Sequence, residues 1–257
     1  MLTVAPAPSN RPKMETTWVA CHQPNFLPWL GFFSKFDLCD IFLVLDDVQI
    51  QRTRGHFTNR CAILQNGKRR WLSIPVQRAD RSIQRISEVQ TAGASWKASL
   101  LETIRHAYRR APFFDDVFGL ITQIMQIDGE SLAEFNIQAL KKLCLYLNLD
   151  PSKIRLASEY SVESTASVRL AELTKIAGGT GYITGQGAND YLDPSVFNAQ
   201  GLTLAYQIFT ETDRPQFAQQ NFEPGLSTID ALFTIGRDET IKHIQSGYIQ
   251  DHSRMHL

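Results

Sequence analysis

The stretch TTWVACHQPNFLPWLGFFSKFDLCDIFLVLDD, residues 16–47, decides the expected fold. It begins with an apolar run at 16–22, typical of a buried strand, and two prolines then force an extended loop. Residues 29–39 are apolar at helical spacing. Residues 41–47 open with a continuous apolar run, typical of a strand covered on both faces. Strand, helix and strand in close succession predict a βαβ unit with two parallel strands.

The rest of the chain predicts one α/β domain. Residues 56–76 form an expected β-hairpin around an Asn-Gly turn. Residues 96–149 hold three segments with helical periodicity, which we expect to form a helical subdomain. Strand and helix patterns then alternate. We therefore expect residues 16–257 to form a mostly parallel, Rossmann-like sheet with helices on both faces and an inserted hairpin, after a disordered tail at 1–15.

Composition narrows the classes of function. The 26 Lys and Arg residues balance 26 Asp and Glu residues, which makes nucleic acid an unlikely partner. No apolar run is long enough to span a membrane, and the N-terminus lacks the apolar core of a secretion signal. We expect a cytoplasmic protein without membrane insertion, and the sequence does not indicate its oligomeric state. Because no CxxC pair occurs, buried free thiols are the expected state of Cys21, Cys39, Cys61 and Cys144.

Polar residues follow several of the predicted strands. In open parallel sheets, ligands bind beyond the carboxyl ends of the strands. The convergence of polar strand ends therefore predicts a binding site along that edge. These ends are His22-Gln23, Asp46-Asp47, Ser158-Glu159, Gly185-Gln186 and Gln207.

His22 stands between a buried strand and a proline-containing loop. An imidazole there can act as a general acid or base, bind a phosphate oxygen or ligate a metal, although it can also cap loop backbone groups. The prolines restrict the loop and favour a functional role. Gln23 and Asn25 of the same loop are candidate substrate-binding residues.

Asp46 and Asp47 follow five apolar residues at the end of the second strand. Strand alternation points one carboxylate into a cleft and the other away. The cleft carboxylate could bind Mg²⁺, hold a sugar hydroxyl or orient His22, and the alternative is a turn-forming cap. If a metal is bound, Asp46, Asp47 and His22 are its candidate ligands. The cofactor is unknown, with Mg²⁺ and a nucleotide as one possibility.

The segment between Val48 and Ala79 contains no acidic residue. Its local positive field predicts a small anionic substrate that bears a phosphate or carboxylate. Arg60, next to Asn59 in the hairpin, is the best candidate, because a guanidinium binds anions bidentately. The basic residues of the segment are Arg52, Arg54, Arg60, Lys68, Arg69, Arg70 and Arg78.

Two later segments offer weaker signals. Gly185 and Gln186 follow a short strand, where backbone N–H groups can approach an anion, although a plain strand-to-helix turn fits equally well. Ser227 and Asp230 have the spacing of a capping box at a helix start.

Blocks of the chain from about Val19 to Gly236 together resemble the WbqC-like family. This resemblance implies a role in surface-polysaccharide or O-antigen biosynthesis, with transfer of an amino acid such as glycine onto a sugar. It also raises Ser227 and Asp230 from a capping pair to candidate substrate-binding residues. The matching blocks are HQPNFLPWLGFFSKFDLCDIFLVLDDVQ (22–49), NRCAI (59–63), WLSIPV (71–76), TGYITGQGANDYL (180–192) and LSTIDALFTIG (226–236).

Residues and resemblance together suggest a transferase that moves an acyl or aminoacyl group to a sugar or another small anionic substrate. We expect His22 to be its general base or acid, and Asp47 to orient His22 or hold a metal. Two alternatives stay open. One is a nucleotidyl-type transferase that uses ATP and Mg²⁺, and the other is a non-catalytic sugar-binding or scaffold protein.

Overall fold

The computed structural model describes residues 16–50, 57–77, 84–185, 187, 192–217 and 221–252. A six-stranded sheet of order β5-β2-β1-β6-β7-β8 lies at its centre. All neighbouring strands are parallel except β7 and β8, which confirms the mostly parallel α/β fold. The strands are β1 (Trp18–His22), β2 (Ile41–Val44), β5 (Ile154–Leu156), β6 (Gly181–Gly185), β7 (Thr203–Ile208) and β8 (Tyr248–Asp251).

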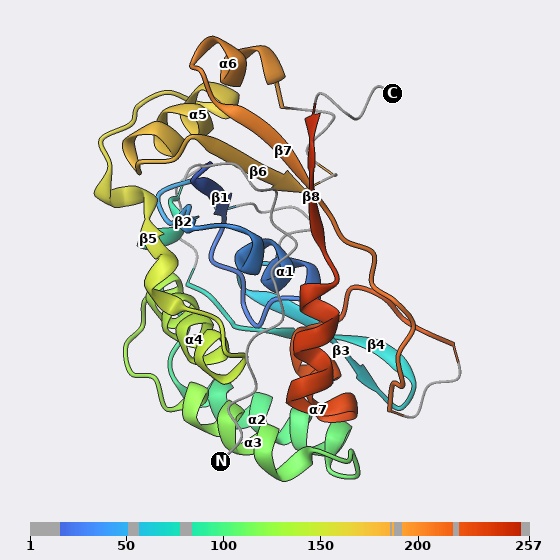
Figure 1. Cartoon of the computed structure of the whole chain (residues 1–257). Helices are drawn as coiled ribbons and strands as arrows, with labels where there is room; N and C mark the ends of the chain where they lie inside the picture. Colours follow the sequence, from blue (N-terminus) through green and yellow to red (C-terminus); the bar gives the residue numbers. More distant parts are fainter. Residues whose placement is uncertain are drawn as a thin grey trace, which may run out of the picture.

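Helices cover both faces of the sheet (Figure 1). Side chains of β1 and β2 alternate between two apolar clusters, because successive residues of a strand point to opposite faces. The first cluster joins the sheet to α1 (Leu30–Leu38), α4 (Leu132–Tyr146) and α7 (Thr228–Gln245). The second joins it to α5 (Ala166–Ile176) and α6 (Pro194–Ala199).

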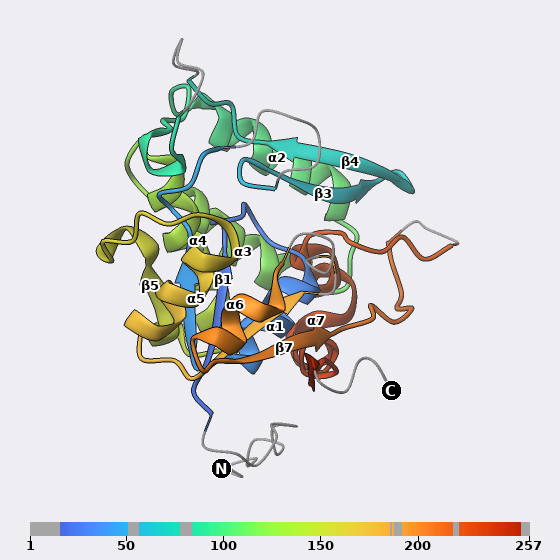
Figure 2. The ribbon, with the colours of Figure 1, turned by 90° about the horizontal axis from the view of Figure 1, so that it is seen from above.

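The predicted hairpin is present as a separate two-stranded sheet of β3 (Arg60–Gln65) and β4 (Lys68–Ser73). Its turn residues Asn66 and Gly67 have φ values of 52° and 69°, as a two-residue hairpin turn requires. The hairpin lies beside α2 (Ser95–Tyr108), and α3 (Phe114–Met125) follows α2, as Figure 2 shows. Short 3₁₀ turns occur at η1 (Ile86–Glu88), η2 (Pro151–Lys153) and η3 (Ala157–Glu159).

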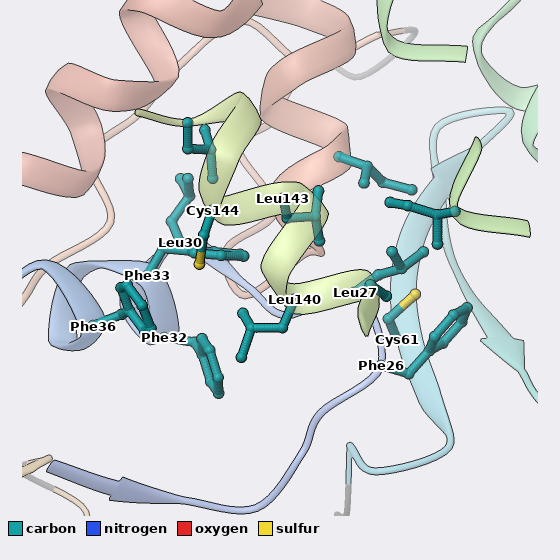
Figure 3. Packing of buried hydrophobic residues seen from close by; sticks show 14 of the residues in the cluster. Phe26, Leu27, Leu30, Phe32, Phe33, Phe36, Cys61, Leu140, Leu143 and Cys144 are labelled. Atoms are coloured by element: carbon teal, nitrogen blue, oxygen red, sulfur yellow. The ribbon is translucent and has the colours of Figure 1, made fainter. Parts of the chain in front are cut away.

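Helix α1 is apolar around most of its circumference and is buried on every side except at Asp37. Leu30 of α1 lies beside Cys144 of α4 (Figure 3). A helix that is hydrophobic all round belongs in the interior. Cys39, Cys61 and Cys144 lie in the first cluster and Cys21 lies in the second, and all four are free and buried.

The structure also departs from the sequence predictions. Strand β2 ends at Val44 rather than at the two aspartates. The antiparallel strand β8 was not predicted. Helix α7 is kinked at Gly236, whose φ of 75° breaks the helical geometry. None of the helices within the described ranges is both long and apolar enough to cross a bilayer.

Gly179 precedes β6 where the backbone packs against β1, so we predict that Gly179→Ala is destabilising. Its Cβ would overlap Val19 and lie 3.0 Å from the carbonyl oxygen of Thr174. We expect a loss of about 1–3 kcal/mol in unfolding free energy, measured by urea denaturation. The control Gly119→Ala lies on α3, where a Cβ would meet no atom within 4 Å. It should stabilise by about 0.5–1 kcal/mol, and equal losses in both variants would contradict the packing.

Candidate functional site

The strand order reverses between β1 and β6. From β1 the chain proceeds outward to β2 and β5, whereas from β6 it proceeds outward to β7 and β8. Helix α1, after β1, and helix α6, after β6, lie on opposite faces of the sheet (Figure 1). Such a reversal leaves a crevice beyond the carboxyl ends of the two central strands, where ligands of doubly wound folds bind.

Strands β1 and β6 separate before they end. Their shared register stops at Ala20 and Ile183. Beyond that pair, β1 remains paired with β2 up to His22, and β6 remains paired with β7 up to Gly185. A Cβ added to Gly185 would meet no atom within 4 Å, so open space adjoins this strand end. His22 and Gly185 therefore flank the crevice between the two strands.

The protein backbone sets the protonation of the His22 ring. Nδ1 lies 3.0 Å from the carbonyl oxygen of Gln23, which can only accept a hydrogen bond, so Nδ1 carries the proton. Nε2 of the neutral ring is then an unprotonated acceptor. The ring is also packed edge-on against Phe32 and Trp29, with centroid distances of 4.8 and 5.7 Å. Its orientation is thus fixed from two sides.

The environment of His22 strongly disfavours the imidazolium form. Burial among these rings, followed by the nearby charge of Lys35, lowers the pKa of His22 to about 3, although the bond to Gln23 opposes the shift. The residue nevertheless keeps partial exposure to solvent. His22 is therefore neutral at physiological pH, is a weak proton acceptor in the ligand-free protein, and does not supply positive charge to an anion.

Lys35 is a residue that the sequence reasoning missed. It projects from α1, its side chain is buried, and Nζ donates to the carbonyl oxygen of Cys21 at 3.2 Å. Burial lowers the pKa of Lys35 to about 8. The available signal was a single basic residue, flanked by phenylalanines, within the otherwise apolar segment FFSKF (32–36).

Asp46 joins two strand ends. Its side chain accepts hydrogen bonds from the backbone N–H of Ser158 at 3.1 Å and from the Ser158 hydroxyl at 2.6 Å. Asp46 is 5% exposed. The predicted convergence of Asp46 and Ser158 at one edge is therefore observed, and the contact fastens β2 to the segment after β5.

Asp47 lines a different space. Its Oδ2 pairs with the Arg169 guanidinium of α5 at 2.5 Å, and Arg169 also donates to the carbonyl oxygen of Val162. The pair opens onto a polar cavity of about 760 Å³. Residues lining the cavity include Asp47, Arg85, Ser158, Ser161, Ser164 and Arg169.

The structure does not bring the two residues proposed as catalytic into contact. His22 packs on α1, whereas Asp47 pairs with α5, and these helices cover opposite faces of the sheet. The carbonyl of Gln23, rather than Asp47, orients the His22 ring. Within the described ranges, no group of three His, Cys, Asp or Glu side chains could hold a metal ion.

Aromatic residues connect the hairpin to His22. Trp71 of β4 is 40% exposed, and its ring lies 5.9 Å from Phe57, which lies 5.1 Å from Trp29. Arg60 stacks over Trp71 at 4.3 Å. We call Trp29, Phe57 and Trp71 the aromatic strip. It places Arg60 at the far end of the strip from His22.

The other loop and hairpin candidates make mostly structural contacts. Gln23 accepts a hydrogen bond from the Thr58 hydroxyl at 3.2 Å. Asn59 donates to the carbonyl oxygen of Ile74 at 2.9 Å. Asn25 is 4% exposed, and its Nδ2 has no hydrogen-bond partner in the described part of the chain. Gln186 lies outside the described residues, as do Arg52, Arg54 and Arg78.

Ser227 and Asp230 lie at the start of α7, in the interior. Ser227 caps the helix and donates to the carbonyl oxygen of Leu27 at 2.7 Å. The fully buried Asp230 pairs with Arg214 at 2.7 Å and accepts a hydrogen bond from the Tyr108 hydroxyl at 2.6 Å. Ser227 also forms a β-bridge with Trp29, so the start of α7 adjoins the aromatic strip, whereas Asp230 fixes the helix against Arg214 and Tyr108.

We predict that Asp230→Ala strongly destabilises the protein, because it leaves the buried Arg214 guanidinium with only the Glu211 carboxylate, 3.5 Å away, as an ion-pair partner. The expected loss of unfolding free energy is about 3–5 kcal/mol in chemical denaturation. The control Glu239→Ala removes an exposed pair with Lys242 on the same helix. It should leave the unfolding free energy almost unchanged, and a comparable effect of the two changes would argue against a buried ion pair.

The lowered pKa of His22 predicts an acid-sensitive fold. Below pH 6.5 the unfolded chain binds a proton at this position, whereas the folded chain does so only near pH 3. Stability is therefore lost as the pH falls through this window. His22→Gln should remove on the order of 2–4 kcal/mol of that loss. The same substitution at the exposed His106, His106→Gln, provides the control, and an equal change in the pH profile of urea midpoints in both variants would contradict the prediction.

Comparison with known proteins supplies the family. The model of the WbqC-like protein family matches residues 23–242. The uncharacterized protein Rv1507c of Mycobacterium tuberculosis (strain ATCC 25618 / H37Rv) is 27% identical over 221 residues, which cover 86% of this chain and 94% of that protein. No solved structure matches the chain. Since the family model spans most of the sequence, including His22's neighbours in the loop and the start of α7, the chain belongs to the WbqC-like protein family.

Proposed function

We propose that this protein is a cytoplasmic transferase that moves an acyl or aminoacyl group, such as a glycyl group, onto a sugar hydroxyl. The observation that carries the proposal is the fixed, neutral His22 ring at the end of β1, with an unprotonated Nε2 beside the crevice between β1 and β6. The resemblance to polysaccharide-biosynthesis proteins supports the choice of a sugar as the acceptor.

In this reaction His22 acts as a general base. The hydroxyl oxygen of the acceptor attacks the activated carbonyl of the donor, and its proton passes to Nε2. The bond to the donor's leaving group breaks as the new ester bond forms, and the proton then passes to that leaving group. The carbonyl of Gln23 contributes by accepting the Nδ1 hydrogen bond, which stabilises the imidazolium that forms transiently.

The aromatic strip fits the proposed acceptor. Ligand sites in proteins combine apolar and aromatic walls with a few polar groups that fix orientation. Trp29, Phe57 and Trp71 offer such a wall between His22 and the half-buried Arg60 of the hairpin. An anionic group on the sugar, or on a nucleotide attached to it, would meet the Arg60 guanidinium at the outer end.

A turnover assay with a matched histidine control tests this proposal. The protein is incubated with activated glycine, supplied as a thioester or an adenylate, and with a panel of nucleotide sugars, and the products are detected by mass spectrometry. We expect an acylated sugar from the unchanged protein. His22→Asn should lower turnover about 10²–10⁴-fold with sugar affinity little changed, because it removes the base and keeps the side chain polar. The exposed His106→Asn should retain full turnover.

The alternatives give distinct results in the same assay. Full turnover by His22→Asn would contradict the general-base role. Release of pyrophosphate from ATP in the presence of Mg²⁺ would instead support a nucleotidyl-type transferase. Saturable binding of a sugar, with no product from any donor, would support a non-catalytic sugar-binding protein.

A further inference from the structure

We propose that the separated carboxyl ends of β1 and β6 form a subsite for a ligand oxyanion, with the Lys35 ammonium as its cationic group and the Gly185 N–H as a second donor. The oxyanion is a carboxylate or a phosphate group of the bound substrate. This inference deepens the proposed function. It rests on that function only for the identity of the substrate that carries the oxyanion.

Lys35 is a buried cation without a neutralising carboxylate in the described part of the chain. The residue is 8% exposed, and its Nζ has one observed acceptor, the carbonyl oxygen of Cys21. An ammonium has three donors, and buried charges in proteins are normally paired. No salt bridge involves Lys35 among the described residues. Two of the three N–H donors of Lys35 therefore have no acceptor among the described residues.

The sheet register explains why this acceptor position exists. The N–H of Gly181 donates to the carbonyl oxygen of Thr17 at 3.1 Å, which sets the phase of the β1–β6 ladder. In that phase the Gly185 N–H would bond the carbonyl oxygen of Cys21. The shared register stops before this bond forms, and Lys35 Nζ takes the Cys21 carbonyl instead. The Gly185 N–H thus faces the gap that Lys35 enters.

The gap adjoins His22. Phe32 packs edge-on against the His22 ring at 4.8 Å, and Lys35 follows Phe32 by three positions on α1, which places the two side chains on the same helix face. Open space beside Gly185 gives a ligand room to enter. An oxyanion held by Lys35 would therefore hold its substrate next to the Nε2 base.

The ionisation of Lys35 makes anion binding sensitive to pH. Burial lowers the pKa of Lys35 to about 8, and the charges of Cys21 and Cys39 oppose this shift. A bound oxyanion would favour the ammonium and raise that pKa. Binding should consequently weaken by roughly tenfold for each pH unit above about 8, since only the ammonium form is competent.

The test measures thermal stability and affinity with simple oxyanions. Acetate, glycine and inorganic phosphate are each compared with chloride at equal ionic strength, between pH 6 and 9.5, using the full chain. The variants are Lys35→Met and Lys35→Arg. The control is Lys153→Met, because Lys153 also donates to a backbone carbonyl, that of Asp37, but lies at the opposite end of β5 from the crevice edge.

We expect at least one of these anions to raise the melting temperature of the unchanged protein and of Lys153→Met. Lys35→Met should weaken its binding roughly tenfold or more. Without an anion, Lys35→Met should melt higher at pH 7, because a buried uncompensated charge is removed. Lys35→Arg should retain the anion effect above pH 8, since a guanidinium stays charged. Stabilisation by acetate or glycine assigns a carboxylate, and stabilisation by phosphate alone assigns a phosphate.

Anion stabilisation that is absent, or equal in Lys35→Met and the unchanged protein, would overturn the subsite. If Lys35→Met does not fold, the pH dependence of the unchanged protein provides the test. Loss of the anion effect above pH 8 would support the subsite, and an effect that does not depend on pH would overturn it. These results are separable from the transferase proposal. His22→Asn should keep the anion effect, so anion binding without His22-dependent turnover would refute the transferase and leave the subsite standing.

Discussion

Strand β1 is hydrogen-bonded in parallel to β2 along one edge and to β6 along the other, and the arrangement of the whole molecule depends on this double pairing. Beyond the last β1–β6 pair, β1 stays in register with β2, and β6 stays in register with β7. The crevice is therefore a consequence of strand order rather than of a loop conformation. The His22 ring, fixed by Gln23 and by aromatic packing, is held at its mouth.

The distribution of charge follows from which carboxylates the fold itself uses. Asp46 is hydrogen-bonded to Ser158, which follows β5, and Asp47 is paired with Arg169 of α5. Both carboxylates after β2 are therefore used by the fold itself. The crevice keeps a neutral imidazole and the Lys35 cation. Such a site suits an anionic ligand and a proton acceptor next to it. Asp230, although part of a family block, is committed to the interior pair with Arg214.

The fold was largely predictable from residues 16–47, because apolar runs, helical spacing and prolines report local structure directly. The site was predictable only in part. His22, Asp46 and Ser158 were identified because polar groups at strand ends contrast with their apolar surroundings. The pairing of His22 with Asp47 was not observed, since β2 ends at Val44 and alternation no longer controls the direction of later side chains. Lys35 was missed because a single lysine in a helix usually faces solvent, and only tertiary packing buries all sides of α1.

The most direct test of this account is the ionisation and tautomer of the His22 ring, followed by ¹H–¹⁵N NMR of the two ring nitrogens as a function of pH. The structure requires a protonated Nδ1 and an unprotonated Nε2 at pH 7, with no protonation of Nε2 until the pH approaches about 3. A ring that becomes doubly protonated near pH 6.5, or that carries its single proton on Nε2, would contradict the role of His22 as the base at this crevice.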